Sequence, residues 1–401
     1  MSEGARRRAL RALLALTFFT WGGFYLVVPL ISVHYVEQLG WAAAAIGVVL
    51  AARQFTQQGL SVASGIVADR FGAKWLIAAG LVLRAGGFAA MAFASSYPLL
   101  LAATVVAAVG GGMFDSPKSA TIAAIARPEE RAHFYAQAGV AAGVGMTVGM
   151  QAGALLMRAN FAAVTLVGGA LYLLMAAAVV VLIPSVRVAE GQTGALHGIR
   201  LALRDRPFLT YVSLMAGQWF MSTQFLITLP LAATAIAGTP DAIAWVFGVN
   251  SLVSVALAYP LPRLAHRIVP PIGAGVIGVA TTALGLFGIA VAGGAASLLL
   301  AAFVFSCGTV LVRPNDQTVT AELAHPLALG SYFGVAALSV AVGGGLGNIA
   351  GGVLYDVGTR TNHPALPWTV CASIGLIAAV GLWLTMTPRL RGREGPLVVR
   401  R

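Results

Sequence analysis

Charged side chains are scarce in this chain. Only 9% of its 401 residues are Asp, Glu, Lys or Arg, whereas 59% are hydrophobic. A soluble domain carries about 25% charged residues. The composition therefore excludes a soluble enzyme or binding module of this length, and it predicts an integral membrane protein.

Cysteine is almost absent as well. Cys307 and Cys371 lie far apart in apolar runs without metal-ligand spacing, so we interpret them as small core residues, with an inter-helix disulfide as the alternative. The chain has no phosphate-binding glycine loop and no paired catalytic motif. These absences argue against a metal site, ATP coupling and an enzyme, and we expect no cofactor.

Long apolar runs, by contrast, fill the chain, and the first begins close to the N-terminus. A basic segment precedes "ALLALTFFTWGGFYLVVPLISV", which is the order found in a secretory signal. The apolar part is longer than the core of a signal, which has about 7–15 residues. It is long enough to span a bilayer, so we interpret it as a retained first helix.

Further apolar stretches of spanning length recur, separated by short polar breaks such as "DRFGAK", "RPEER" and "AGTPD". The longest break, residues 184–206, is interpreted as a cytoplasmic linker. It divides the chain into an N-terminal six-helix bundle, 1–183, and a C-terminal six-helix bundle, 207–401. The twelve predicted spans are 12–34, 42–66, 75–96, 98–122, 134–157, 161–183, 208–231, 243–262, 272–292, 296–320, 330–354 and 366–387.

The positive charges indicate the orientation of these spans. The sequence has 25 Lys and Arg residues and a net charge of +12. If the predicted spans cross the membrane in turn, the Lys and Arg residues outside them fall on the same side as the N-terminus. Arg158 and Arg360 are the exceptions. Because Lys and Arg collect on the cytoplasmic side of membrane proteins, both termini are predicted to be cytoplasmic. The basic excess is therefore a topology signal, with membrane lipids rather than nucleic acid as the partner.

The two halves of the chain show a weak internal repeat. When the first half of the sequence is aligned with the second so that Arg70 matches Arg267, Gly111 also matches Gly308. Two halves of six spans in the same topology form a parallel repeat, which is the arrangement of major facilitator transporters.

Local motifs strengthen this comparison. "GIVADRFGAK" resembles the signature between helices 2 and 3 of the major facilitator superfamily, and "RPEERAHFYA" is similar to that superfamily too. "RQFTQQGL", "FDSPKSA", "LGSYFG" and "GNIAGGVLYDVG" resemble the twelve-helix drug:proton antiporters, closest to the MdtH-type multidrug efflux proteins. The resemblance covers nearly the whole chain. It implies an all-α integral membrane protein with twelve transmembrane helices in two pseudo-symmetric six-helix bundles.

Two stretches depart from common antiporter patterns. "TVVAAVGGGMFD" lacks the Arg that many relatives carry in helix 4, and "GVAAGVGMTVGMQAG" lacks the proline of the helix-5 pattern. A proton mechanism therefore cannot be transferred directly from better-known relatives.

The resemblance also implies a conformational latch. In the superfamily the acidic residue of the loop signature, here Asp69, meets the N-terminus of helix 11, which begins near Leu329. A carboxylate gains roughly 0.3–1 kcal/mol at a helix N-terminus, and the contact would favour the outward-open state. A plain hairpin with a solvated Asp-Arg pair is the alternative. The latch residues are Gly65, Asp69, Arg70, Gly72 and Lys74.

Several ionisable residues lie within the predicted spans, where a charge costs about 2.5–3.5 kcal/mol unless it faces protein or water. We expect Asp115 to pair with Arg53 or Arg84, with neighbouring glutamines completing the hydrogen bonds. The pair would be either purely structural or a proton-linked switch. The predicted charge network comprises Asp115, Arg53, Arg84, Asp316, Arg313 and Lys118.

A substrate cavity is implied by the superfamily, in which spans 1, 4, 7 and 10 surround the central cavity. Aromatic and methionine side chains with a few amides suit bulky amphipathic molecules, although packing or lipid contact is the alternative for each. The predicted lining residues are Phe18, Trp21, Tyr25, Phe114, Gln218, Trp219, Met221 and Gln224.

These observations predict a proton-coupled exporter of hydrophobic or amphipathic compounds in the inner membrane. We expect it to be a monomer that uses the proton gradient and no cofactor. The alternatives are an exporter of the same fold for a dedicated lipid or metabolite, and a non-transporting membrane receptor.

Overall fold

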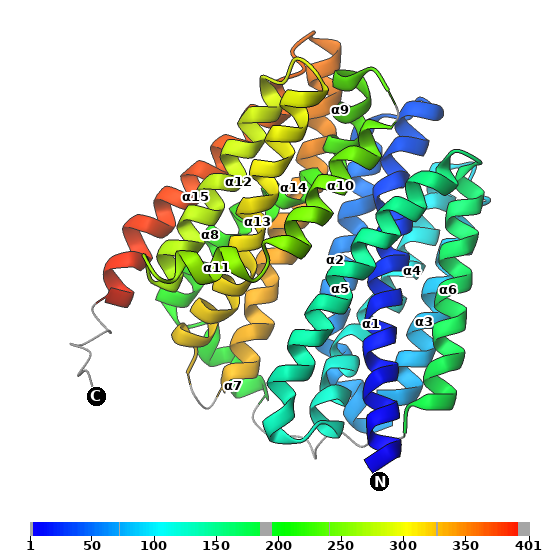
Figure 1. Cartoon of the computed structure of the whole chain (residues 1–401), viewed down its shortest axis with the longest axis vertical. Helices are drawn as coiled ribbons and strands as arrows, with labels where there is room; N and C mark the ends of the chain where they lie inside the picture. Colours follow the sequence, from blue (N-terminus) through cyan, green and yellow to red (C-terminus); the bar gives the residue numbers. More distant parts are fainter. Residues whose placement is uncertain (1–2, 72, 185–194, 240, 326–327, 392–401) are drawn as a thin grey trace. The chain divides into compact units, whose positions relative to one another are not determined.

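The computed structural model describes residues 3–71, 73–184, 195–239, 241–325 and 328–391. The described residues are helical or lie in short connections, and no strand occurs among them. The elements, shown in Figure 1, are α1 (Glu3–Ser32), η1 (Val33–Gln38), α2 (Ala43–Phe71), α3 (Ala73–Met91), α4 (Tyr97–Ile125), α5 (Pro128–Met157), α6 (Phe161–Leu182), α7 (Ala195–Ala202), α8 (Arg206–Ser222), η2 (Thr223–Phe225), α9 (Thr228–Ala237), α10 (Ala242–Ala256), α11 (Pro260–Ala265), α12 (Pro271–Ala290), α13 (Ala295–Leu323), α14 (Leu329–Arg360) and α15 (Leu366–Arg391).

The membrane character predicted from the composition is confirmed. Among the described residues nine helices are long and apolar enough to cross a bilayer, or ten when the bent pair α8 and α9 is taken as one span. Every predicted span overlaps a helix or a broken helix. The all-α membrane fold is thus the observed one.

Two predicted spans are broken in the structure. The span predicted at 208–231 bends by 47° between α8 and α9, across the 3-10 turn η2. The span predicted at 243–262 ends as α10 at Ala256, and the short α11 begins at Pro260. Proline has no backbone N–H to donate, so Pro260 and Pro262 each remove a hydrogen bond that a continuous helix would need.

The described chain groups into two compact units. Unit 1 comprises Met1–Thr193, Phe225–Ser251 and Asn348–Asp356. Unit 2 comprises Gly194–Gln224, Leu252–Gly347 and Val357–Arg401.

In unit 1, glycine residues allow two helices to cross at close distance. α1 packs along α5, where Gly145, Gly149 and Gly153 face the backbone carbonyls of α1. A Cβ atom at Gly149 would collide with the carbonyl oxygen of Gly22. Glycine at these positions therefore allows the two backbones to touch, as at other close crossings of membrane helices.

Unit 2 uses the same device between α12 and α13. Gly278 and Gly285 of α12 face Val312 and Phe305 of α13, with no room for a Cβ atom at Gly285.

Both cysteines are free thiols, and Cys371 is buried. The interpretation of Cys371 as a core residue is confirmed, and no disulfide forms.

Candidate functional site

A cluster of cations and aromatic rings lies inside unit 1, where α1, α2 and α3 meet. Arg53 of α2 is 7% exposed and Arg84 of α3 is 3% exposed. Their guanidinium carbons lie 5.1 and 5.2 Å from the ring centroid of Phe24 on α1. One aromatic ring is thus shared by two buried cations, each in cation–π contact with it.

Arg53 is held by neutral amides. Its Nη1 donates to Gln57 Oε1 at 3.1 Å, and its Nη2 donates to Gln54 Oε1 at 2.6 Å. Its Nε is buried and has no partner among the described residues. Gln54 and Gln57 of the same helix thus supply two hydrogen bonds to this arginine.

Arg84 lies in an aromatic cage. Its guanidinium carbon lies 5.2–5.7 Å from four ring centroids, those of Phe24, Phe88, Phe114 and Tyr172. The faces of these rings carry partial negative charge, which offsets part of the cost of burying the cation. Phe88 and Tyr172 were not predicted, because apolar helix faces in α3 and α6 give no sequence signal that sets them apart.

The predicted acidic partner cannot be placed. Asp115 belongs to α4, but its side chain lies outside the described residues. Among the described side chains, no carboxylate contacts Arg53 or Arg84. Lys118, one turn further along α4, is buried with its Nζ 5.7 Å from the Phe114 ring centroid.

The latch signature lies largely outside the described side chains. Gly65, Asp69 and Arg70 form the last turns of α2, where only the backbone is described, and Gly72 lies outside the described residues. Lys74 opens α3 and packs against Trp75, with Nζ 5.7 Å from the ring centroid. The contact of Asp69 with the start of α14 stays a prediction.

In unit 2, Asp316 is held by a tyrosine that was not predicted. The hydroxyl of Tyr211 on α8 donates to Asp316 Oδ1 on α13 at 2.8 Å. Arg313, one turn earlier on α13, is exposed. Asn315 is buried and lies 2.7 Å from His266 Nε2. The predicted polar region of α13 therefore faces its neighbours through Asp316 and Asn315.

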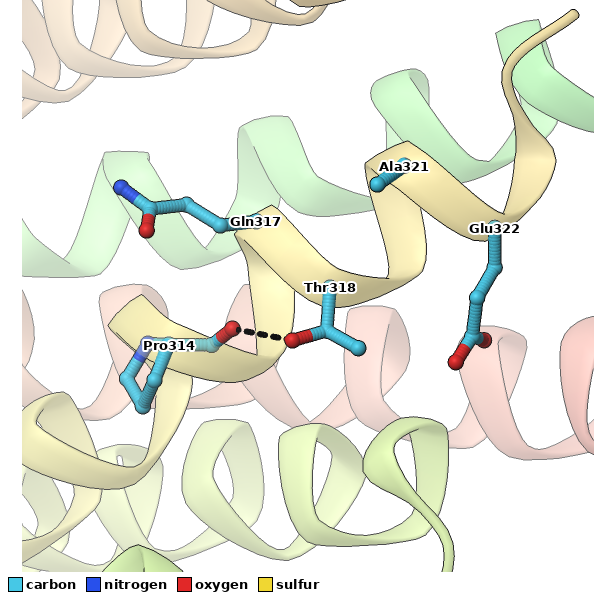
Figure 2. A pocket seen from close by; sticks show the side chains of 5 residues that line it. All are labelled: Pro314, Gln317, Thr318, Ala321 and Glu322. Atoms are coloured by element: carbon cyan, nitrogen blue, oxygen red, sulfur yellow. Dashed lines mark hydrogen bonds between the residues drawn. The ribbon is translucent and has the colours of Figure 1, made fainter. Parts of the chain in front are cut away.

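An open depression of about 630 Å³ follows one face of α13 in unit 2. Figure 2 shows its lining side chains, which recur at helical spacing: Pro314, Gln317, Thr318, Ala321 and Glu322. Thr318 Oγ1 turns back and donates to the carbonyl of Pro314 at 2.9 Å. Gln317 and Glu322 supply the remaining polar groups.

The predicted cavity residues divide into two groups. Phe18, Trp21, Tyr25 and Trp219 are partly exposed, whereas Phe114, Gln218, Met221 and Gln224 are buried. Gln224 Nε2 donates to the carbonyl of Gly347 at 2.9 Å, and this contact braces η2 against α14. In this conformation the buried group serves packing, so its role in substrate contact stays a prediction.

A charge cluster lies where α1 and α5 begin. Arg6 donates to Glu3 and Glu130, and Arg127 donates to Glu3 at 3.1 Å. Arg6 is 8% exposed. Its hydrogen bond lowers the pKa of the Glu130 carboxyl. The sequence motif "RPEER" contains Glu130, but its partner on α1 could not be predicted.

Polar contacts also connect the helix ends opposite the N-terminus of α1, which we call the outer ends. Asp356 of α14 accepts hydrogen bonds from the backbone of α2. Arg158 donates to Asp241 at 2.7 Å, and Thr234 donates to Glu37 at 2.6 Å. All of these residues belong to unit 1.

Comparisons with known proteins agree with this architecture. The family model of the Major Facilitator Superfamily matches residues 13–348. Proteins named multidrug resistance protein MdtH are 37% identical in Photorhabdus laumondii, with 90% of each chain covered, and 34% identical in Klebsiella pneumoniae, with 94% covered.

Solved structures share the fold at low sequence identity. A bacterial homologue of the human lysosomal transporter Spinster, 13% identical, superimposes with a TM-score of 0.83 over 99% of this chain and 100% of that one. The nucleoside transporter NupG, 14% identical, gives 0.80 over 94% and 99%. The chain therefore belongs to the major facilitator superfamily and is a multi-pass membrane transporter of small molecules rather than an enzyme.

Proposed function

We propose that the protein exports hydrophobic or amphipathic compounds by alternating access, driven by inward proton flow. The observation that carries this proposal is the similarity, over 90% of the chain, to curated proteins named multidrug resistance proteins. The partly exposed aromatic residues of α1 support a substrate with a large apolar surface.

An acidic side chain within a span would carry the proton, and Asp115 and Asp316 are the two candidates. Asp316 has the neutral Tyr211 as its hydrogen-bond partner. A carboxyl with a neutral partner can gain or lose a proton without breaking an ion pair. Asp115 directly follows Phe114, whose ring contacts Arg84. An arginine near Asp115 would hold it ionised until a conformational change separates the two groups.

The remaining parts of the proposal follow the sequence. Two six-helix bundles, 1–183 and 207–401, would alternate around the substrate, with both termini in the cytoplasm of a cell whose inner membrane holds the transporter. Asp69 would stabilise the outward-open state from the cytoplasmic side. The working unit would be a monomer without a cofactor, in contact with membrane lipids and protons.

Purified protein in liposomes tests the proposal, with ethidium as the amphipathic probe. A pH gradient should drive ethidium across the membrane, and collapse of the gradient by nigericin should stop it. Asp115→Asn or Asp316→Asn should abolish driven movement while ethidium binding is retained. Asp241→Asn, which alters an exposed ion pair at the outer ends, is the matched control and should transport normally.

Two results would contradict the proposal. Ethidium movement at the same rate after nigericin treatment would rule out proton coupling. Driven transport at the wild-type rate in both Asp115→Asn and Asp316→Asn would show that neither carboxyl carries the proton.

A further inference from the structure

The outer end of α14 reaches the first residues of α2. The two carboxylate oxygens of Asp356 accept hydrogen bonds from consecutive backbone N–H groups, Ala43 N at 2.9 Å and Ala44 N at 2.9 Å. Ala43 is fully buried, and Asp356 is partly exposed. One carboxylate thus caps a helix that belongs to the other half of the sequence.

The sequence before α2 has no cap of its own. The first N–H groups of a helix have no partner within the helix, and a Ser, Thr, Asp or Asn before the first turn commonly supplies one. Here the residues before α2 are Gly40, Trp41 and Ala42, whose side chains hold no acceptor. Asp356 therefore supplies the acceptors, and its negative charge lies at the positive end of the α2 dipole.

Glycine makes this cap possible. Gly352 of α14 faces the backbone carbonyl of Ala43, and Gly47 of α2 faces the carbonyl of Asn348. A Cβ atom at either glycine would collide with that carbonyl. The backbones of α2 and α14 therefore touch over the turns that precede and follow the cap, and any separation of these turns breaks both hydrogen bonds.

The Arg158–Asp241 and Thr234–Glu37 contacts at the outer ends are weaker candidates for control. Arg158 and Asp241 are 66% and 52% exposed, and exposed ion pairs contribute little to stability. Thr234 and Glu37 share one exposed hydrogen bond. The Asp356 cap differs because a charged acceptor satisfies two backbone donors that would otherwise lose their protein partner.

We propose that Asp356 is an outer latch, closed while the outer ends of α2 and α14 are together and released when the pathway opens on that side. The proposal rests on alternating access as the proposed function. Loss of the latch shifts the equilibrium toward the state that is open at the outer ends. A carboxylate at a helix N-terminus contributes roughly 0.3–2 kcal/mol, so the ratio of closed to open molecules should fall by about 2- to 30-fold on its removal.

Spin labels measure this ratio directly. In a Cys307→Ser, Cys371→Ser background, labels at Leu39→Cys and Arg360→Cys report the distance between the outer ends by pulsed electron resonance in lipid nanodiscs. Asp356→Asn should move population from the short to the long distance. Ala44→Pro removes one of the two donors and leaves the carboxylate intact, and proline is tolerated in the first turn of a helix. It should shift the population in the same direction.

Asp241→Asn is the matched control, since it removes a carboxylate from the same end without uncapping α2. It should leave the distances close to those of the unaltered protein. Unchanged distances in both Asp356→Asn and Ala44→Pro overturn the latch, as does an equal shift in Asp241→Asn. The measurement needs neither substrate nor a pH gradient, so it separates failure of the latch from failure of proton-driven export.

Discussion

Phe24 is the ring that two buried arginines of unit 1 share. Its ring lies against both Arg53 and Arg84. Each cation–π contact contributes about 0.5–2 kcal/mol, with the larger values at desolvated sites. Phe24→Leu should therefore lower stability by about 1–3 kcal/mol and reduce the melting temperature in detergent. Phe19→Leu on the same helix, at a ring without a described cation contact, should cost less. An equal loss in the two variants would contradict this assignment.

Glu130 gives a second prediction for single residues. The hydrogen bond from Arg6 lowers the pKa of Glu130 in the folded protein. The stabilisation is therefore present above the pKa of the unfolded chain, about 4.3, and is lost as the pH falls through the lower folded value. Glu130→Gln should flatten the fall in melting temperature between about pH 5 and pH 3. Arg6→Gln should have the same effect, and an unaltered pH profile in both would argue against the pair.

The sequence predicted these residues unequally. Arg53 and its glutamines were accessible to prediction, because residues at helical spacing on one helix share a face. The rings around Arg84 come from α1, α3, α4 and α6, and only the packing of those helices brings them together. The same holds for Tyr211 and Asp316. Contacts within a helix follow from its period, whereas contacts between helices depend on the crossings.

At the scale of helices, the close crossing of α1 and α5 can be tested with two glycines of α5. Gly149 has no room for a Cβ atom against Gly22, whereas nothing lies within 4 Å of a Cβ atom at Gly143. Gly149→Ala should cost about 1–3 kcal/mol through strain. Gly143→Ala should be neutral or stabilise by up to about 1 kcal/mol, because alanine favours helix. Thermal unfolding of both variants in detergent measures the difference, and a loss of stability in Gly143→Ala would contradict it.

At the scale of elements, the sequence predicted helices well and their interruptions poorly. Hydropathy located each long helix, because an apolar run of bilayer length has few alternatives to a helix. It missed the π-helical turn η1 and the bend between α8 and α9. The second of these lies in a run of Thr, Gln, Phe, Leu and Ile without glycine or proline. At this bend Gln224 donates to the carbonyl of Gly347 on α14, a contact between elements that hydropathy does not report.

The predicted orientation of the whole molecule rests on its charge distribution and is open to a direct test. Leu203, which is 48% exposed and follows α7, lies on the predicted cytoplasmic side. Arg360 ends α14 on the opposite side. In a cysteine-free background, Arg360→Cys should react with an impermeant thiol reagent in intact cells, and Leu203→Cys should react only after the membrane is broken. The reverse pattern would invert the topology.

The two proposed latches would stabilise opposite states of the transporter through the same two helices, α2 and α14. Asp69 at the end of α2 is proposed to meet the start of α14, and Asp356 near the end of α14 caps the start of α2. Antiparallel helices present the N-terminus of one beside the C-terminus of the other. If Asp69 meets the start of α14 as proposed, each end of the pair would join one carboxylate to one helix N-terminus. Only one end would be closed at a time.

The cation cluster has an electrical consequence. Arginine keeps its charge at physiological pH, so any net charge that Arg53 and Arg84 retain lies within the electric field of an energised membrane. Moving one elementary charge through the full field involves about 2.3 kcal/mol per 100 mV. A conformational change that carried both guanidinium groups across a tenth of the field would couple to voltage by about 0.5 kcal/mol per 100 mV. Membrane potential would then bias the resting conformation of the transporter even when no proton or substrate is bound.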